Sequence, residues 1–402
     1  MRLFFSSAAI FAVLLFSAAD WPAFRGGDKF SNSAEKNVPV KLDAPEALAW
    51  KVETPGKGLS SPIVVAGRVI VTCSSGPKEQ RLHVLCFDAK NGKKLWERQF
   101  WATGRTICNP STAVAAPTPA TDGKRIFAFF ASNDLACLDL DGNLLWYRGL
   151  TYDYPAAFND VGMSSSPIVA DGAVVVQIES QGDSFAAGID AKTGETLWRR
   201  DRPRVMTWCS PALYRGAPAE KELVLLQGGS GLSAVNPRKG ESLWQYSAKG
   251  NEITSSAVEN GVVYLPADGI TAVQPDGNSA TAKAVWKASR LNPGAASPVV
   301  HDGKVYVVNK AGVLNCAETS KGEVTWQLRM KGNFWSTPVI ADGHMYLFSD
   351  DGLAQVVSLG EKGELASSFS LGEAVMASPA VADGAIFVRS ASHLWRFGGK
   401  GN

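Results

Sequence analysis

The chain has 402 residues, of which 45% are hydrophobic and 19% charged, and its formal net charge is +2. This composition supplies enough apolar material for a large core. The near balance of charges, without a basic stripe, excludes the electrostatic footprint of a nucleic-acid-binding protein. We therefore expect no nucleic-acid partner.

Residues 1–19 predict a cleaved signal peptide. Arg2 gives the positive start, residues 3–16 form an apolar core, and three small residues precede Asp20. A membrane anchor is the alternative interpretation, but this segment is short for a membrane span. The cleavage position carries no Cys for a lipoprotein anchor, and no later segment is apolar enough to span a membrane. We expect a soluble exported protein that is periplasmic, peripheral to the outer membrane, or secreted.

Residues 20–46 come next and are too few to form a domain. The stretch begins Trp21-Pro22-Ala23-Phe24. We expect an extended N-terminal segment whose Trp21 and Phe24 dock on the remainder of the chain.

From residue 47 to residue 402 one motif recurs eight times, and Ser166 to Trp198 is its clearest copy. A Ser-Pro or a relative opens a short apolar run, a tight turn with Gly follows, and a third strand ends near an acidic residue. A further Gly turn then leads to a Trp. Repeats of roughly 40–50 residues built from short strands are typical of β-propellers.

The eighth copy has room for only three strands, whereas residues 47–53 read as a fourth strand without the first three. Pairing this closing strand, which contains Trp50, with the C-terminal blade removes both free sheet edges. We therefore predict a single all-β domain, an eight-bladed propeller of four-stranded antiparallel blades. Seven blades with a spare hairpin is the alternative count.

The six cysteines of an exported chain suggest disulfides. The repeat register indicates otherwise for Cys86, Cys137 and Cys316, which occupy a position where other copies carry Gly or Ala. We interpret these three as small core residues. Cys73 and Cys86 lie on neighbouring strands, and their pairing remains open. The scattered histidines and the Asp-rich turns show no metal-binding or acid–base spacing, so we expect no catalytic or metal-binding residues.

Three long loops on one face enter blades two, three and four, over residues 99–116, 148–164 and 200–208. Aromatic, acidic and basic residues on exposed loops fit a protein-recognition surface. The alternative is that these loops only cover neighbouring blade ends. The candidate residues on and beside these loops are Arg105, Asn109, Tyr152, Asp153, Tyr154, Phe158, Asn159, Asp160, Glu179 and Asp183.

A second candidate site follows from register. The residues three positions before each repeat opener should surround the mouth of the central channel. They are Leu59, Ala116, Ser164, Trp208, Thr254, Ala295, Trp335 and Met376. The repeat does not require Trp208 or Trp335. These two side chains either plug the channel or, as a second hypothesis, form an apolar or stacking floor for a ligand.

The nine residues from Asp190 to Trp198 resemble the tryptophan-docking motif of pyrroloquinoline-quinone-like (PQQ-like) propellers, and residues 88–96 form a second good copy. In that family the Trp packs between blades and the Gly makes the turn. The resemblance therefore implies a structural role for seven tryptophans: Trp50, Trp96, Trp146, Trp198, Trp244, Trp286 and Trp326.

The resemblance implies two kinds of function. Quinoprotein dehydrogenases carry PQQ and calcium over the channel, with a vicinal disulfide and a catalytic Asp, and this chain has no adjacent Cys pair. The branch that looks like BamB, a scaffold of outer-membrane protein assembly, matches better in size and export signal. We therefore expect a monomeric scaffold without cofactor or catalysis that binds another envelope protein through the loops of one face. A PQQ- and calcium-dependent dehydrogenase, and a carbohydrate- or peptide-binding module, are the alternatives.

Overall fold

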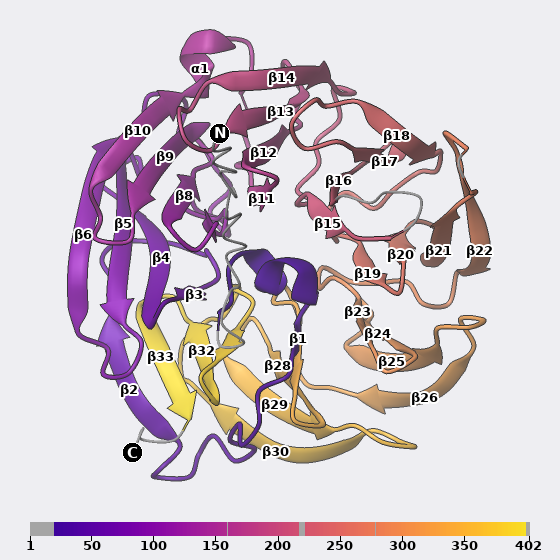
Figure 1. Cartoon of the computed structure of the whole chain (residues 1–402). Helices are drawn as coiled ribbons and strands as arrows, with labels where there is room; N and C mark the ends of the chain where they lie inside the picture. The colour runs from indigo at the N-terminus through magenta and orange to yellow at the C-terminus, as the bar shows by residue number, and fades with distance from the viewer. Residues whose placement is uncertain (1–19, 159, 217–221, 278, 399–402) are drawn as a thin grey trace, which may run out of the picture.

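The computed structural model describes residues 20–158, 160–216, 222–277 and 279–398. Eight antiparallel sheets of four strands stand around a central axis, as Figure 1 shows, and the sheet of the seventh blade gains β1 as a fifth strand. The prediction of an eight-bladed, all-β propeller is confirmed. The predicted signal peptide and Asn159 lie outside the described residues.

In each blade the strands run from the axis to the rim in chain order, except that the eighth blade takes the N-terminal β2 as its outer strand. The innermost strands are β3 (Ile63–Val65), β7 (Ala120–Thr121), β11 (Ile168–Ala170), β15 (Ala212–Tyr214), β19 (Ala257–Glu259), β23 (Val299–His301), β27 (Val339–Ala341) and β31 (Ala380–Ala382). The second strands are β4 (Arg68–Ser75), β8 (Arg125–Phe129), β12 (Ala173–Ile178), β16 (Leu223–Gly228), β20 (Val262–Pro266), β24 (Lys304–Val308), β28 (His344–Phe348) and β32 (Ala385–Arg389). The third strands are β5 (Arg81–Asp88), β9 (Asp134–Asp139), β13 (Phe185–Asp190), β17 (Gly231–Val235), β21 (Ile270–Pro275), β25 (Val313–Glu318), β29 (Leu353–Ser358) and β33 (His393–Gly398). The outer strands are β6 (Lys94–Trp101), β10 (Leu144–Gly149), β14 (Thr196–Asp201), β18 (Ser242–Tyr246), β22 (Ala282–Ala288), β26 (Val324–Arg329), β30 (Glu364–Ser370) and β2 (Leu48–Glu53).

Burial explains the apolar runs of the sequence. The second strand β12 is buried at all six positions, because neighbouring blades cover both of its faces. The outer strand β30 has no buried residue, and from Ser367 onward partly buried residues alternate with exposed ones, as expected of a rim strand with one solvated face. The core therefore lies between blades, in the middle of the ring wall.

The ring is closed by the N-terminal strand, as predicted. Strand β2 pairs antiparallel with β33, with Lys51 opposite Trp395. This pairing supplies the outer strand of the eighth blade, so β33 becomes an inner strand and β2 takes the outer-edge position that the fourth strand holds in the other blades.

Seven of the eight outer strands carry a Trp that packs toward the next blade, and β30 of the seventh blade has none. Trp198 Nε1 donates a hydrogen bond to the Pro237 carbonyl oxygen at 2.7 Å, and its ring covers Gly240. The same bond to the following blade is made by four others: Trp50, Trp96, Trp146 and Trp286. Trp244 and Trp326 keep the position, but their Nε1 atoms have no partner among the described residues.

The residue that faces each of these rings on the neighbouring strand must have a small side chain. Gly188 lies opposite Trp198, and a Cβ atom on it would stand 2.1 Å from the Trp198 Nε1. In three other blades a buried Cys faces the Trp instead: Cys86, Cys137 and Cys316. These thiols therefore serve as small core groups.

All six cysteines lie within the described residues and all are free. Cys73 is opposite His83, whereas Cys86 is opposite Ile70. Because adjacent strand residues project to opposite faces, Cys73 and Cys86 point away from each other. Their pairing, left open by the sequence, is excluded by register.

The N-terminal segment is not extended throughout, contrary to the sequence expectation. It contains the 3-10 helix η1 (Phe24–Lys29) and the short strand β1 (Asn32–Ser33), which pairs parallel with β27. Trp21 is fully buried, and its backbone exchanges hydrogen bonds with Val64 on β3. Figure 1 places η1 at the centre of the ring, and the segment then runs outward past β1 to the rim, where the Ser367 hydroxyl of the outer strand β30 donates to the Val40 carbonyl oxygen.

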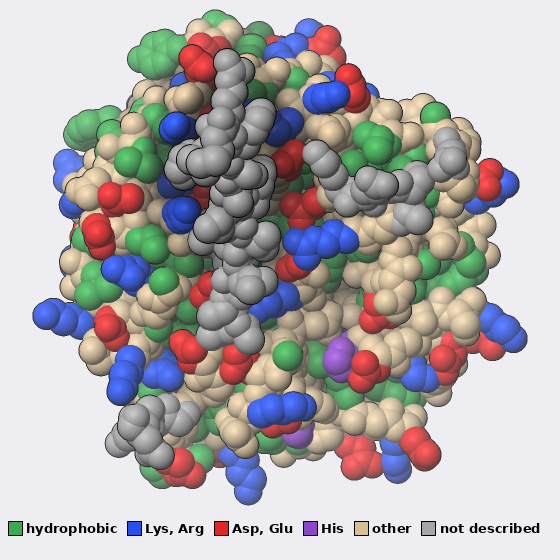
Figure 2. Space-filling model, viewed as in Figure 1, with side chains coloured by type: hydrophobic (Ala, Val, Ile, Leu, Met, Phe, Trp, Pro, Cys, Tyr) green, Lys and Arg blue, Asp and Glu red, His purple; other side chains and the backbone are tan. Residues whose placement is uncertain are grey.

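Acidic and basic side chains are interspersed over the face in Figure 2, without a continuous stripe of either sign. Among the described residues, no helix is both long and apolar enough to cross a bilayer. The only α-helix there is the single turn α1 (Leu150–Asp153), in the loop that enters the third blade.

Candidate functional site

A closed ring of hydroxyl groups lines the channel where the innermost strands begin. Each blade contributes one Ser or Thr, and its oxygen accepts a hydrogen bond from the backbone N–H of the equivalent residue in the preceding blade. The eight N···O distances lie between 2.9 and 3.1 Å. The members of this hydroxyl ring are Ser61, Thr118, Ser166, Ser210, Ser255, Ser297, Thr337 and Ser378.

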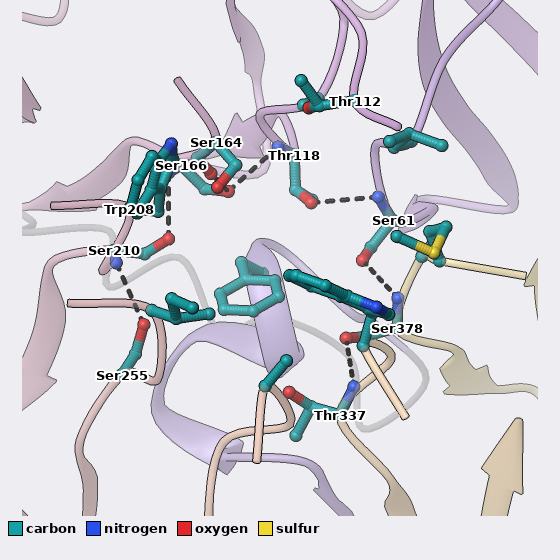
Figure 3. Close-up of a pocket in the computed structure, with 18 of the residues that line it drawn as sticks. Ser61, Thr112, Thr118, Ser164, Ser166, Trp208, Ser210, Ser255, Thr337 and Ser378 are labelled. Carbon is teal, nitrogen blue, oxygen red and sulfur yellow. Dashed lines mark hydrogen bonds between the residues drawn. The ribbon is translucent and has the colours of Figure 1, made fainter. Parts of the chain in front are cut away.

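The hydroxyl ring explains why the repeat opens with Ser or Thr. The N–H groups before the innermost strands have no ladder partner within their own blade, and a buried N–H without an acceptor is costly. The side chain of the next blade supplies that acceptor. Figure 3 shows part of the ring, with dashed bonds linking Ser61, Thr118 and Ser166 around the channel.

A cavity of about 400 Å³ lies against the hydroxyl ring, and all eight ring residues line it. Seven of the eight residues that register placed at the channel mouth also line it, all except Thr254. Trp208 donates from Nε1 to the Gly162 carbonyl oxygen at 2.9 Å, whereas the side chain of Trp335 is 47% exposed. The sequence-predicted pair thus borders one cavity, with one ring fixed and one open to solvent.

The N-terminal segment borders this cavity through Phe24. A smaller cavity shares Phe24, Ser166, Ser210 and Ser255 with the large one, and Arg25 lines it. The Arg25 side chain is buried and donates to the carbonyl oxygens of Ser255 and Ser256 at 3.2 and 2.6 Å. Burial lowers the pKa of Arg25 to about 10, which still leaves the guanidinium charged at neutral pH.

The candidate loop residues of blades two and three mostly hold one another in place. Arg105 pairs with Asp160 at 3.2 Å and stacks over the ring of Phe158 at 4.2 Å. This contact joins the loop that enters the second blade to the loop that enters the third.

A second group of candidates braces the third blade. Tyr154 packs on Phe185 at 4.6 Å, and Arg199 lies over both rings while pairing with Asp183 at 2.8 Å. Asp153 pairs with Arg148 at the end of β10. These contacts match the alternative interpretation, in which the loops cover blade ends.

The remaining candidates are divided between interior and surface. Glu179 is buried and pairs with Arg202 at 2.5 Å, and burial raises the pKa of this carboxyl although Arg202 opposes the shift. The Asn109 side chain borders the large cavity and caps its own loop by accepting from Ser111. Tyr152 stands apart, with 77% of its side chain exposed.

Sequence reasoning missed a second exposed aromatic residue on this side of the ring. Trp101 ends β6 and is 62% exposed, and the Tyr147 hydroxyl donates to its carbonyl oxygen at 3.2 Å. Tyr152 follows β10 of the neighbouring blade, and its ring lies against Gly149 at the end of that strand. The available signal was that Trp101 lies five residues beyond Trp96, outside the docking register.

The quinone and calcium of the dehydrogenase alternative would need suitable ligands around the cavity. Calcium prefers carboxylate and carbonyl oxygens. No described residue that lines the cavity is charged, and the described residues contain no cluster of three His, Cys, Asp or Glu that could hold a metal ion. The free cysteines also offer no vicinal disulfide. The residues present therefore do not fit that cofactor pair.

A family model described as outer membrane protein assembly factor BamB matches residues 17–157, 154–265 and 266–366. The chain belongs to this family. Within the BamB family, the chain is 24% identical over 322 residues to the outer membrane protein assembly factor BamB of Burkholderia pseudomallei, which covers 79% of this chain and 66% of that protein. It is also 26% identical over 216 residues to the tetrathionate hydrolase of Acidithiobacillus ferrooxidans, over 46% of this chain and 42% of that protein. The chain thus spans less than two thirds of the length of these two relatives.

Solved structures share the fold of this BamB family member. The crystal structure of BamB from Moraxella catarrhalis superposes with a TM-score of 0.64 at 16% identity, over 88% of this chain and 98% of the other. A europium-containing methanol dehydrogenase reaches 0.73 at 13% identity, over 95% and 98%. The quinohemoprotein alcohol dehydrogenase of Comamonas testosteroni reaches 0.69 at 13% identity, over 96% and 81%. At these identities the likeness describes architecture alone.

Proposed function

We propose that this protein is an exported, non-catalytic scaffold that binds another envelope protein in outer-membrane protein assembly. Family membership supports the proposal, since the matching model and a relative are described as outer membrane protein assembly factors. The observation that carries it is the exposed pair Trp101 and Tyr152, on adjacent blades of one side of the ring.

The surroundings of this pair suit a binding surface. Exposed Trp and Tyr side chains contribute strongly to protein interfaces because they bury large areas with few rotatable bonds. The loops beside the pair are braced by the Arg105–Asp160 ion pair, so they present a largely preformed surface. Preformed surfaces lose less conformational entropy on binding.

Site-specific photo-crosslinking tests the proposal. A photoreactive phenylalanine analogue is placed at Trp101 or at Tyr152, and Leu365, which is 51% exposed on β30 of the seventh blade, serves as the matched control. We expect both test positions to crosslink the same outer-membrane assembly component in intact cells and position 365 to leave it unlabelled. Labelling of that component from all three positions, or from none, contradicts the proposed surface.

A functional assay separates scaffold from enzyme. Cells lacking the protein should lose outer-membrane protein content, and the wild-type chain should restore it while the Trp101→Ala/Tyr152→Ala variant does not. Purified protein loaded with PQQ and calcium should show no turnover in a dye-linked assay with an alcohol or a sugar as substrate. Purified protein incubated with tetrathionate alone should also show no turnover. Turnover in either assay contradicts the non-catalytic proposal.

A further inference from the structure

The hydroxyl groups of the ring act almost entirely as hydrogen-bond acceptors. A hydroxyl group carries one proton to donate and lone pairs to accept. Every member accepts a backbone N–H, and Ser166 alone donates, weakly, to the Ser164 carbonyl oxygen at 3.5 Å. The hydroxyl protons of the other seven have no acceptor among the described residues, although these side chains are at most 6% exposed. The cavity is therefore bordered by buried donors that lack acceptors.

A buried positive charge lies beside these donors. Arg25 is 3% exposed, donates to the carbonyl of Ser255 and lines the smaller cavity together with three members of the hydroxyl ring. It forms no ion pair with a described carboxylate. Its guanidinium also donates to the Ser256 carbonyl oxygen and lies over the rings of Phe24 and Phe30. A buried charge without an opposite partner is unfavourable, and its field reaches far in a low-dielectric interior.

The cavity lining also includes large apolar side chains. Trp208, Trp335, Met206 and Met376 border the cavity, together with smaller apolar side chains. Large aromatic and thioether groups accommodate flat or irregular apolar bodies. The cavity thus has an apolar part at its mouth and a donor-rich part, close to a positive charge, at the hydroxyl ring.

We propose that this cavity binds a small organic monoanion with an apolar body. Its carboxylate or sulfonate oxygens accept hydrogen bonds from the hydroxyl ring and balance the Arg25 charge, while its body packs against Trp208 and Trp335. This site is independent of the proposed scaffold surface, because neither Trp101 nor Tyr152 lines the cavity.

A matched pair of probes tests the inference. Isothermal titration calorimetry compares 2-naphthoate with 2-naphthamide, which keeps the ring system but carries no charge. We expect one naphthoate per chain, bound at least roughly tenfold more tightly than the amide. Equal affinities, or no binding of naphthoate up to about 1 mM, would overturn the inference.

Variants then assign the parts of the site. Arg25→Lys keeps the charge and should keep the preference for naphthoate, whereas Arg25→Gln should abolish it and leave naphthamide binding unchanged. Trp335→Ala should weaken both probes equally, and Tyr152→Ala, away from the cavity, should weaken neither. If Arg25→Gln retains the full preference, the charge argument is wrong. If this variant does not fold, the wild-type comparison of the two probes still decides.

Because the scaffold proposal is tested in cells with Trp101 and Tyr152 variants, and the cavity with purified protein, failure of one leaves the other standing. Crosslinking at Tyr152 without binding of naphthoate would support the scaffold proposal and contradict the ligand site. Preferential binding of naphthoate without crosslinking would support the ligand site and contradict the scaffold surface.

Discussion

Removing one hydroxyl from the ring should destabilise the whole propeller. Ser297 and Ser255 are 5% and 4% exposed, and the Ser255 N–H donates to the Ser297 Oγ at 3.0 Å. Ser297→Ala deletes the acceptor without leaving a large void, so the buried Ser255 N–H loses its partner. Leaving a buried donor unsatisfied costs about 1–3 kcal/mol. The free energy of unfolding in urea should fall by that amount.

Two controls make the experiment decisive. Ser297→Thr should stay within about 0.5 kcal/mol of wild type, because two blades already use Thr337 and Thr118 at this position. Ser289→Ala removes an exposed hydroxyl from the loop after β22 and should have no measurable effect. If Ser297→Ala unfolds at the same urea concentration as Ser297→Thr, the hydroxyl ring does not stabilise the fold.

Three further predictions concern turns, thiols and a carboxyl group. Gly194 and Gly343 have similar φ angles of +77° and +75°, but a Cβ on Gly194 would stand 2.8 Å from a docking Trp, whereas a Cβ on Gly343 would meet open space. Gly194→Ala should therefore lower the melting temperature much more than Gly343→Ala. Equal decreases would mean that backbone strain alone determines the loss. In the native protein only Cys108, the sole cysteine that is not buried, should react with a thiol reagent at neutral pH, and slowly because burial raises its pKa, whereas all six thiols should react after unfolding. Burial alone would raise the pKa of Glu97, but hydrogen bonds from neighbouring side chains lower this pKa to about 2. The ionised carboxylate therefore stabilises the folded state at pH values above its unfolded pKa, and this stabilisation is lost as the pH falls toward 2. Glu97→Gln should therefore lower stability at pH 7 but not near pH 2, and a constant difference across this range would contradict the assignment.

Residues with a repeated local role were predictable from the sequence. The Trp that ends seven of the eight repeats, the Gly turn and the small residue across from the Trp recur at fixed spacing, so register alone places them. The same register brought Trp208 and Trp335 to one cavity, although they are far apart in the chain. The repeat period therefore predicts where a residue lies in its blade even at positions where the residue type varies.

Features made by contacts between blades or by unique segments were not predictable in the same way. The opening Ser was visible as part of the motif, but its bond to the preceding blade spans more than 40 residues and follows no local pattern. The N-terminal segment occurs once, so no repeat indicated that it would enter the channel with Arg25 buried. Trp101 was missed because an isolated aromatic residue at a strand end has no periodic partner.

The pairing of β2 with β33 sets an order of events during folding. The two strands come from opposite ends of the chain, so the eighth blade cannot be completed until nearly every residue has been synthesised. Bringing such distant segments together costs loop-closure entropy and slows folding. Until then the seventh blade and the first expose unpaired or uncovered surfaces, which are prone to aggregation. A nascent chain would therefore be most vulnerable in its last stage of assembly, and a circular permutant that makes β2 continuous with β33 should shorten that stage.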